Sequence, residues 1–294
     1  MMGLSRLGMA SILALLLAAA LLIPTSCGGE SGTIVGVMKQ IPAGANDIVY
    51  WNVKEMEKDE DLHGMLDRWK ADNEAWLDQF AVRTGDVEHF LGFSTGPAGG
   101  PAGNVSTGNV SAGDASAVVK GTFDLEQMRT QLGSREYNDG DFKGLEVWES
   151  PDGVYWVVLT KDMVGGGPKE DIIESIRVME GGDPSLYDDQ DARDVVDRLP
   201  GGVLMHFRKA GESPLAGELA YGDSFKRKDQ ETLEAHIVLK FLEPEDAAAV
   251  LEIVEEEADL AYDKISAKQD GRYLRIDGEI DIEDLTLAAP DTGG

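Results

Sequence analysis

The sequence contains a single cysteine, Cys27, among its 294 residues. One cysteine excludes a disulfide framework within the chain and any zinc site built from several cysteines. Positive charge is also scarce: 26 lysine and arginine residues stand against 55 aspartate and glutamate residues, giving a formal net charge of −29. Since binding to phosphate backbones needs an electropositive surface, this balance argues against nucleic acid as a partner.

Motifs of several enzyme classes are missing as well. The sequence has neither a phosphate-binding P-loop nor the dinucleotide-binding glycine pattern. The four histidines, His63, His89, His206 and His236, do not have the spacing of a metal-binding motif. Gly165–Pro168 lacks the Lys-Ser/Thr pair of a phosphate site, and we predict a loop there. We therefore expect no cofactor and no catalytic residue.

What is present begins with an apolar N-terminus. Residues 1–26 contain one charged side chain, Arg6, and an apolar or small run extends from Leu7 to Ile23. A positive start, an apolar run and small residues after it are typical of a secretory signal peptide. The run of about 17 residues is slightly shorter than the ~20 that a helix needs to span a bilayer core.

The position of Cys27 makes this N-terminus resemble the signal of a bacterial lipoprotein, whose lipobox of apolar and small residues ends at a cysteine. Here Pro24, Thr25 and Ser26 precede Cys27. The resemblance implies cleavage before Cys27, lipidation of Cys27, and attachment to the extracytoplasmic face of the cell membrane. An uncleaved anchor helix or an ordinary signal cleavage is the alternative.

Residues 27–41 are predicted to form a flexible tether, because Gly28–Gly32 is polar and rich in glycine. The signal peptide contains one positive and no negative charge, so the exported part is more acidic than the whole chain. Anionic lipid headgroups repel such a body, and we expect it to contact the membrane only through its lipid.

The exported part contains an internal repeat of a strand, a helix and a hairpin. The first copy is predicted at residues 118–123, 124–132 and 145–160, and the second at residues 236–241, 244–262 and 265–277. Phe123 and Phe241 are 118 residues apart, as are Asp152 and Asp270 in the two hairpin turns. The repeat predicts an α+β fold of two related strand-helix-hairpin halves, with antiparallel-rich sheets covered by helices.

The first half is predicted to span residues 42–199 and the second residues 200–285, with a disordered tail at 286–294. Residues 94–116 are predicted to be a mobile loop, because glycine, serine and other small residues dominate them. Additional helices are expected from apolar spacing at Leu62–Phe80, Lys169–Met179 and Asp188–Leu199. A short capped helix closed by glycine is expected at Thr84–Gly92.

The order of these features is similar to that of a group of exported bacterial proteins known only as a domain of unknown function. The similarity lies in the early strand Asp47–Val53, the Gly85–Gly92 element and the stretch Ser185–Gly202. It covers most of residues 42–285. The resemblance implies an exported fold of this kind and no particular activity or catalytic residue.

Two sets of side chains are candidates for chemistry. His206 and His236 lie in predicted strands, where we expect neutral, hydrogen-bonded structural histidines. Five aspartates lie close together, and oxygen-only ligand sets suit hard cations such as Ca²⁺. They are Asp183, Asp188, Asp189, Asp191 and Asp194. The calcium-loop spacing is not met, and acidic residues at a helix N-terminus on a solvated face are the interpretation that we prefer for the cluster.

Three functional classes remain open. The first is a lipid-anchored extracytoplasmic protein that binds a partner or has a structural role without catalysis, and this is the one we expect. The second is a Ca²⁺-dependent binding or sensing module. The third is a carboxylate-based hydrolase of envelope or extracellular glycans. The acidic surface predicts a cationic or neutral protein or small-molecule partner with salt-sensitive association.

Overall fold

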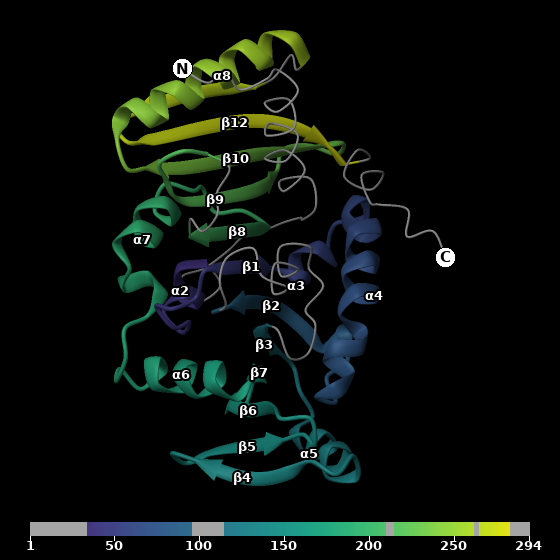
Figure 1. Cartoon of the computed structure of the whole chain (residues 1–294). Coiled ribbons are helices and arrows are strands. Elements are labelled where there is room, and N and C mark those ends of the chain that lie inside the picture. The colour runs from purple at the N-terminus through teal and green to yellow at the C-terminus, as the bar shows by residue number, and fades with distance from the viewer. Residues whose placement is uncertain (1–33, 96–114, 210–214, 262–264, 283–294) are drawn as a thin grey trace.

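A computed structural model describes residues 34–95, 115–209, 215–261 and 265–282 (Figure 1). In this part of the chain, twelve strands form one continuous sheet in the order β11-β12-β10-β9-β8-β1-β2-β3-β7-β6-β5-β4. Every neighbouring pair is antiparallel. The predicted α+β fold with an antiparallel sheet is confirmed, and the two halves share that sheet.

The elements have the following bounds. The strands are β1 (Asp47–Trp51), β2 (Val87–Ser94), β3 (Ser116–Gly121), β4 (Asn138–Phe142), β5 (Leu145–Glu149), β6 (Val154–Thr160), β7 (Met163–Pro168), β8 (Leu204–Lys209), β9 (Glu218–Arg227), β10 (Thr232–Phe241), β11 (Ser266–Asp270) and β12 (Tyr273–Asp281). The helices are α2 (Ile34–Met38), α3 (Val53–Met56), α4 (His63–Gln79), α5 (Leu125–Ser134), α6 (Lys169–Met179), α7 (Gln190–Val196) and α8 (Pro244–Ala261), with single turns η1 (Glu60–Leu62), η2 (Thr84–Asp86) and η4 (Leu186–Asp188).

The two halves meet where β1 pairs with β8. From this seam, β1-β2-β3 extends in one direction and β8-β9-β10 in the other. The predicted hairpins are present as β5–β6 and β11–β12. However, β12 pairs directly with β10, whereas β7 lies between β3 and β6. The strand-helix-hairpin order thus recurs along the chain, but the sheet neighbours of the two copies differ.

Helices cover both faces of the sheet because side chains alternate along each strand. On β1, Val49 and Trp51 enter a core that also contains side chains of α4, α5 and α8. Ile48 and Tyr50 enter the opposite core with side chains of α2, α6 and α7. In Figure 1, α2, α6 and α7 follow one side of the sheet and α4 and α5 the other.

The predicted amphipathic helix at Leu62–Phe80 is confirmed as α4, and its aromatic side chains belong to the core. Trp69 and Trp76 meet Phe90 of β2 edge to face, with ring centroids 5.6 and 5.8 Å apart. Phe80 stacks on Trp156 of β6 at 4.4 Å. None of these five side chains is more than 2% exposed. Burial of large aromatic rings is a major stabilising contribution, so this helix anchors the first half.

The short helix predicted at Thr84–Gly92 is wrong. Only the single turn η2 forms, and the chain continues as the strand β2 from Val87. Between β1 and β3, β2 is a central strand, and Phe90, Leu91 and Phe93 are all buried. A central strand is apolar on both faces, so it does not show the alternation by which a half-exposed strand is recognised.

The loop predicted at Gly165–Pro168 is also wrong, because these residues belong to β7. The glycines are required by close neighbours. A Cβ atom on Gly166 would lie 2.6 Å from the Trp156 ring, and one on Gly167 would lie 2.3 Å from Ser116 Oγ. Glycine in a strand allows this close approach, and the same composition suggests a loop when only the sequence is considered.

The predicted tether of residues 27–41 is too long at its C-terminal end. Ile34–Met38 forms α2, and Met38 and Ile41 are 0% exposed. Their apolar side chains join the core beside α6 and α7. The signal peptide, Cys27, almost all of the predicted loop at 94–116 and the tail at 286–294 lie outside the described residues.

Among the residues that the structure describes, no helix has the length and apolar character needed to cross a membrane.

Candidate functional site

The seam between the halves contains a buried histidine between two carboxylates. His206 lies on β8, Asp47 on β1 and Asp223 on β9, and the alternation of the strands brings all three to the same face of the sheet. His206 Nε2 is 2.8 Å from Asp47 Oδ1, and His206 Nδ1 is 3.4 Å from Asp223 Oδ2. The side chains of His206 and Asp223 are 1% exposed and that of Asp47 is 12% exposed.

Further polar groups extend this cluster along β8 and β9. Tyr221 donates a hydrogen bond to Asp223, and its ring meets His206 edge to face at 5.6 Å. Arg208 lies over the Tyr221 ring, 5.4 Å from its centroid, and 3.5 Å from Glu218. The seam cluster, by which we mean these six residues, is therefore a continuous ionic and hydrogen-bonded network across three strands.

The environment of His206 fixes its charge. Burial lowers the pKa of the imidazole, but the charge and hydrogen bond of Asp47 and the carboxylate of Asp223 close to Nδ1 outweigh it and raise this pKa to about 10. His206 is thus a hydrogen-bonded structural histidine as predicted, but the expectation of a neutral ring is wrong. A cationic ring enclosed by two carboxylates is no general base, because a base must be unprotonated.

His236 lies on the opposite face of the sheet. Its Nδ1 atom is 2.6 Å from Asp277 Oδ1, and Arg275 binds both carboxylate oxygens of Asp277 at 2.8 Å. Glu234 is 3.6 Å from the other ring nitrogen. His236 is therefore hydrogen-bonded, as expected for a structural histidine.

His89 also has a partner, since its Nδ1 atom lies 3.0 Å from the Tyr50 hydroxyl. The two rings are stacked with centroids 6.1 Å apart. Burial lowers the pKa of His89, and the nearby charge of Lys120 lowers it further. Among the described residues, the hydrogen-bond partner of His89 is a hydroxyl and not the carboxylate that orients a catalytic ring.

The acidic cluster predicted as a weak metal candidate is divided among structural roles. Asp188 accepts hydrogen bonds from the backbone and side chain of Ser185. Asp189 caps the N-terminus of α7 and lies 2.9 Å from Lys209. Asp183 lies upstream and is exposed. In the described part of the chain, no group of three or more His, Cys, Asp or Glu side chains is arranged to hold a metal ion.

The other two aspartates of this cluster enclose a buried lysine. Lys240 of β10 is 1% exposed, and its Nζ atom is 2.7 Å from Asp191 and 2.6 Å from Asp194. Tyr273 also donates to Asp194 at 2.8 Å. Burial raises the pKa of Asp194, but hydrogen bonds from Lys240, Tyr273 and Gln190 outweigh it and lower this pKa to about 2. These contacts fasten α7 to the second half.

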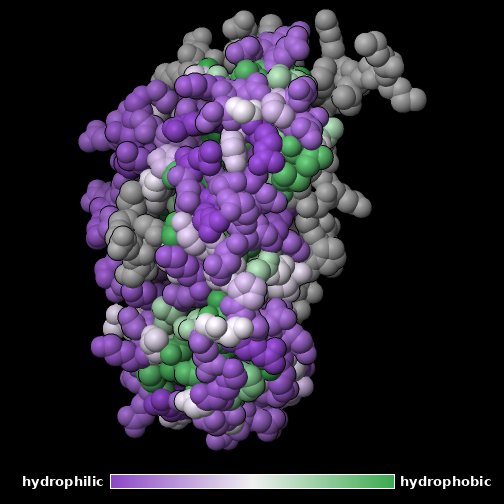
Figure 2. Space-filling view, turned by 90° about the vertical axis from the view of Figure 1, so that its left-hand side faces the viewer, coloured by the Kyte–Doolittle hydropathy of each residue, from purple (hydrophilic) through white to green (hydrophobic). Residues whose placement is uncertain are grey.

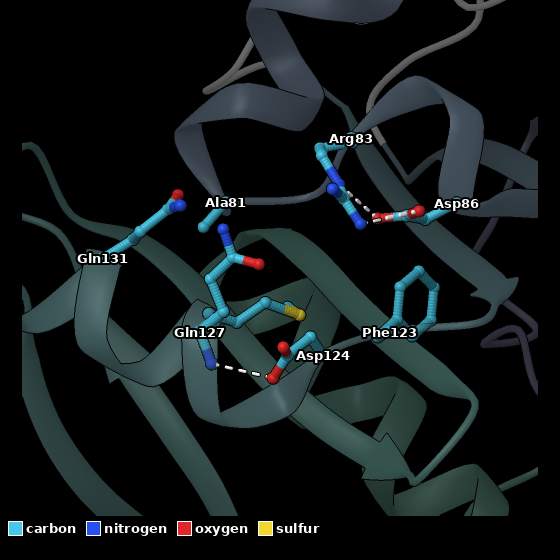
Figure 3. Close-up of a pocket in the computed structure, with 8 residues that line it drawn as sticks. Ala81, Arg83, Asp86, Phe123, Asp124, Gln127 and Gln131 are labelled. Carbon is cyan, nitrogen blue, oxygen red and sulfur yellow. Dashed lines mark hydrogen bonds and ion pairs between the residues drawn. The ribbon is translucent and has the colours of Figure 1, made fainter.

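A small pocket lies between the η2 turn and the start of α5 (Figure 3). Arg83 and Asp86 form a two-point ion pair beside it, at 2.7 and 3.1 Å. The other lining residues are Ala81, Phe123, Asp124, Gln127, Met128 and Gln131. Its volume of about 20 Å³ has room for about one water molecule, so it is no site for an organic ligand.

One catalytic pattern does occur in the sequence: Gly92-Phe93-Ser94-Thr95-Gly96 has the spacing of the Gly-x-Ser-x-Gly nucleophile elbow. An elbow places its serine at a sharp, exposed turn after a strand. Here Gly92 to Ser94 are ladder residues of β2, paired with β1, and Ser94 is 3% exposed. The pattern therefore does not form an elbow.

Sequence reasoning found His206, His236 and the aspartates of residues 183–194, but missed their partners. Asp47, Asp223 and Lys240 are isolated charges in apolar strands, 159, 17 and 46 residues from the groups that they bind. The one available signal was a charged residue at an inward position of a strand, where an ion needs a partner.

No model of a known protein family matches the chain. The chain is 24% identical over 176 residues to the uncharacterized protein MJ0635 of Methanocaldococcus jannaschii. The match covers 59% of this chain and spans 62% of the relative's length. The chain is thus distantly similar to an uncharacterised protein, and the similarity assigns no activity.

A solved structure described as "Structure of crystal form I of TP0453" resembles the chain with a TM-score of 0.47 at 10% identity. The superposition covers 85% of this chain and 95% of that one. No functional assignment follows from a likeness of this degree.

Proposed function

We propose that this protein is a lipid-anchored, extracytoplasmic protein of the cell membrane that binds a partner or supports the envelope without catalysis. The observation that carries the non-catalytic part is the use of its buried charges. His206 lies between two carboxylates at 1% exposure, and Lys240 does so as well. Both cations are buried and are engaged in neutralising carboxylates of the fold.

The ion pairs and the pocket weaken the two alternative functions, a calcium module and a glycan hydrolase. A calcium module would need free carboxylate oxygens converging on one point. Asp189, Asp191 and Asp194 instead bind Lys209 and Lys240. A glycan hydrolase would need two carboxyl groups flanking a cleft. The pocket beside Arg83 accepts about one water molecule and is too small for a sugar ring.

The surface supports a macromolecular partner. Figure 2 shows the side that carries α2, α6 and α7, where hydrophilic colours dominate and hydrophobic ones gather low on the molecule, toward the end with β4–β6. Partly buried apolar side chains of this region include Phe142, Leu145, Met163 and Ile173, and Met179 is 36% exposed. An apolar area within an acidic surface suits a neutral or cationic protein with salt-sensitive association.

The anchoring part of the proposal rests on the apolar run before Cys27 and is tested by Cys27→Ser. We expect the variant to leave the membrane fraction or to accumulate as an unprocessed precursor, because no acyl chain can be attached to serine through a thioether. Fractionation and mass spectrometry of the mature N-terminus measure both results. Ser31→Ala, in the same predicted tether, is the matched control and should fractionate as the wild type. Membrane-bound Cys27→Ser protein of mature, unchanged mass would contradict the proposal.

The non-catalytic part is tested separately with purified protein and envelope glycans. We expect no release of reducing ends above the background of the buffer. Sustained release that disappears when a carboxylate is replaced by its amide would contradict this part and leave the anchoring part untouched.

A further inference from the structure

The seam cluster has a geometry that depends on a single proton. His206 Nε2 is hydrogen-bonded to Asp47 Oδ1 at 2.8 Å, and Nδ1 lies 3.4 Å from Asp223 Oδ2 in an ion-pair contact, so a carboxylate lies close to each ring nitrogen. A neutral imidazole has one N–H group, and its other nitrogen is a lone-pair acceptor. With the proton removed, one carboxylate would face that lone pair in a site from which water is excluded. Such an unpaired buried charge is strongly unfavourable.

His206 lies where the two halves meet, so its proton affects the contact between them. Asp47 belongs to the first half, while His206 and Asp223 belong to the second. The Asp47–His206 contact crosses the β1–β8 ladder, where Val49 lies directly opposite His206. A second set of ion pairs across the halves joins Arg227 to Asp59 and Asp61, but there the Asp61 side chain is 51% exposed. Exposed pairs of this kind contribute little. Lys240 and Lys209 also pair with first-half aspartates, but those aspartates belong to α7 and its N-terminal cap. The Asp47–His206 pair is thus the buried ionic contact that bridges β1 and β8 themselves.

We propose that the protonated ring of His206 is a lock between the two halves, which holds β1 against β8 at neutral pH and is released when alkaline pH removes the proton. The groups that face the ring are Asp47 from β1 and Asp223 and Tyr221 from β9. Arg208, on the same strand, lies over the Tyr221 ring and beside Glu218. Arg208 does not take the place of the imidazolium, because it is engaged with the Tyr221 ring and Glu218.

The direction of the pH effect follows from linkage. The pKa of His206 is about 10 in the folded protein, against an ordinary value of 6.5. A raised pKa gives stability that is fully present below pH 6.5 and is lost as the pH rises toward 10. In this window the folded protein binds one more proton than the unfolded chain does, so the Tm falls by about 3 °C for each pH unit. Burial also raises the pKa of Tyr221, which adds a fall of the same sign only near and above pH 10.

The first experiment is thermal unfolding of the full-length protein between pH 6.5 and 9.5, below the tyrosine range. We expect the wild-type Tm to fall steadily, and His206→Gln to have a lower Tm at pH 7 and a nearly flat profile. His236→Gln is the matched control from the opposite face of the sheet and should keep the wild-type slope. A flat wild-type profile, or equal slopes in the wild type and His206→Gln, would overturn the proposal.

A second experiment does not depend on the folding of His206→Gln. NMR of the wild-type imidazole should show an unchanged imidazolium from pH 6 to 9, and Asp47→Asn, which keeps the ring, should move its titration midpoint downward. Hydrogen exchange should show protection of β1 and β8 amides falling above pH 9, while the β10–β12 ladder keeps its protection. A wild-type midpoint below pH 7.5, or equal loss of protection in both ladders, would refute the lock.

Discussion

At the scale of single residues, the excess of acidic over basic side chains is reflected in the surroundings of the buried cations. His206 and Lys240 are each 1% exposed, and each is enclosed by two carboxylates. In a chain with 55 acidic residues, a buried cation meets two partners easily. Two carboxylates around one cation satisfy more of its donors than a single pair does, and they repel each other strongly once the cation is removed.

Asp194 gives a prediction at this scale. Its pKa is about 2 in the folded protein and 3.8 ordinarily, so its contribution is complete above about pH 4 and is lost as the pH falls toward 2. We expect Asp194→Asn to lower the free energy of unfolding by about 2 kcal/mol at pH 7, from the pKa difference. Urea unfolding at pH 7, 4 and 3 measures the effect, and the difference from the wild type should shrink with the pH.

Asp183→Asn is the matched control, since Asp183 is exposed in the same acidic segment. It should leave the free energy of unfolding within about 0.5 kcal/mol of the wild type. An Asp194→Asn deficit that stayed constant down to pH 3 would show that the loss has another cause than the charge on this carboxylate.

At the scale of elements, β7 shows that glycine can be required inside a strand. Gly166 lies against the Trp156 ring, which in turn stacks on Phe80 at the end of α4. The contact therefore connects the sheet to the helix that covers it.

The two edge strands of the sheet, β4 and β11, carry charged side chains. β4 carries Asp139 and Asp141, and β11 carries Lys268 and Asp270, and charged side chains on short edges discourage pairing with other chains.

Gly166→Val is the prediction for this element. The new side chain would collide with the Trp156 ring and force the aromatic layer apart, at a cost of about 1–3 kcal/mol or more. Denaturant unfolding followed by tryptophan fluorescence measures it.

Gly133→Ala, in α5, is the control with the opposite sign. A Cβ atom there meets nothing within 4 Å, and alanine in a helix is better than glycine by about 0.5–1 kcal/mol. Equal effects of the two substitutions would contradict the role assigned to Gly166.

At the scale of the whole molecule, the continuous sheet makes the two halves one structure. β8 and β1 are neighbouring interior strands near the centre of the twelve, so separation of the halves would expose two unpaired edges. Salt bridges and the Lys209 contact with Ala43 add to the backbone ladder at the seam. We therefore expect the halves to unfold together near neutral pH.

The tryptophans allow a direct test of this cooperativity. All five lie in the first half, at positions 51, 69, 76, 148 and 156, so tryptophan fluorescence reports on that half alone. Far-ultraviolet circular dichroism reports on both halves. At pH 7 the two unfolding transitions should coincide, as in a two-state process. In His206→Gln they should separate if the lock has the role proposed for it, and separation in the wild type at pH 7 would contradict a single unit.

The sequence by itself determined the local features of this protein. Periodicity placed α4, α6 and α8, because their apolar faces recur at helical spacing, and the Asp-Gly turns placed the hairpins β5–β6 and β11–β12. Both signals involve residues that are neighbours in sequence. The tertiary structure decided the rest. β2 and β7 are strands because partners on both sides bury them, and α2 belongs to the folded body because a distant core accepts Met38 and Ile41. The charge on His206 has the same origin, since Asp47 lies 159 residues away and is brought within 2.8 Å only by the pairing of β1 with β8.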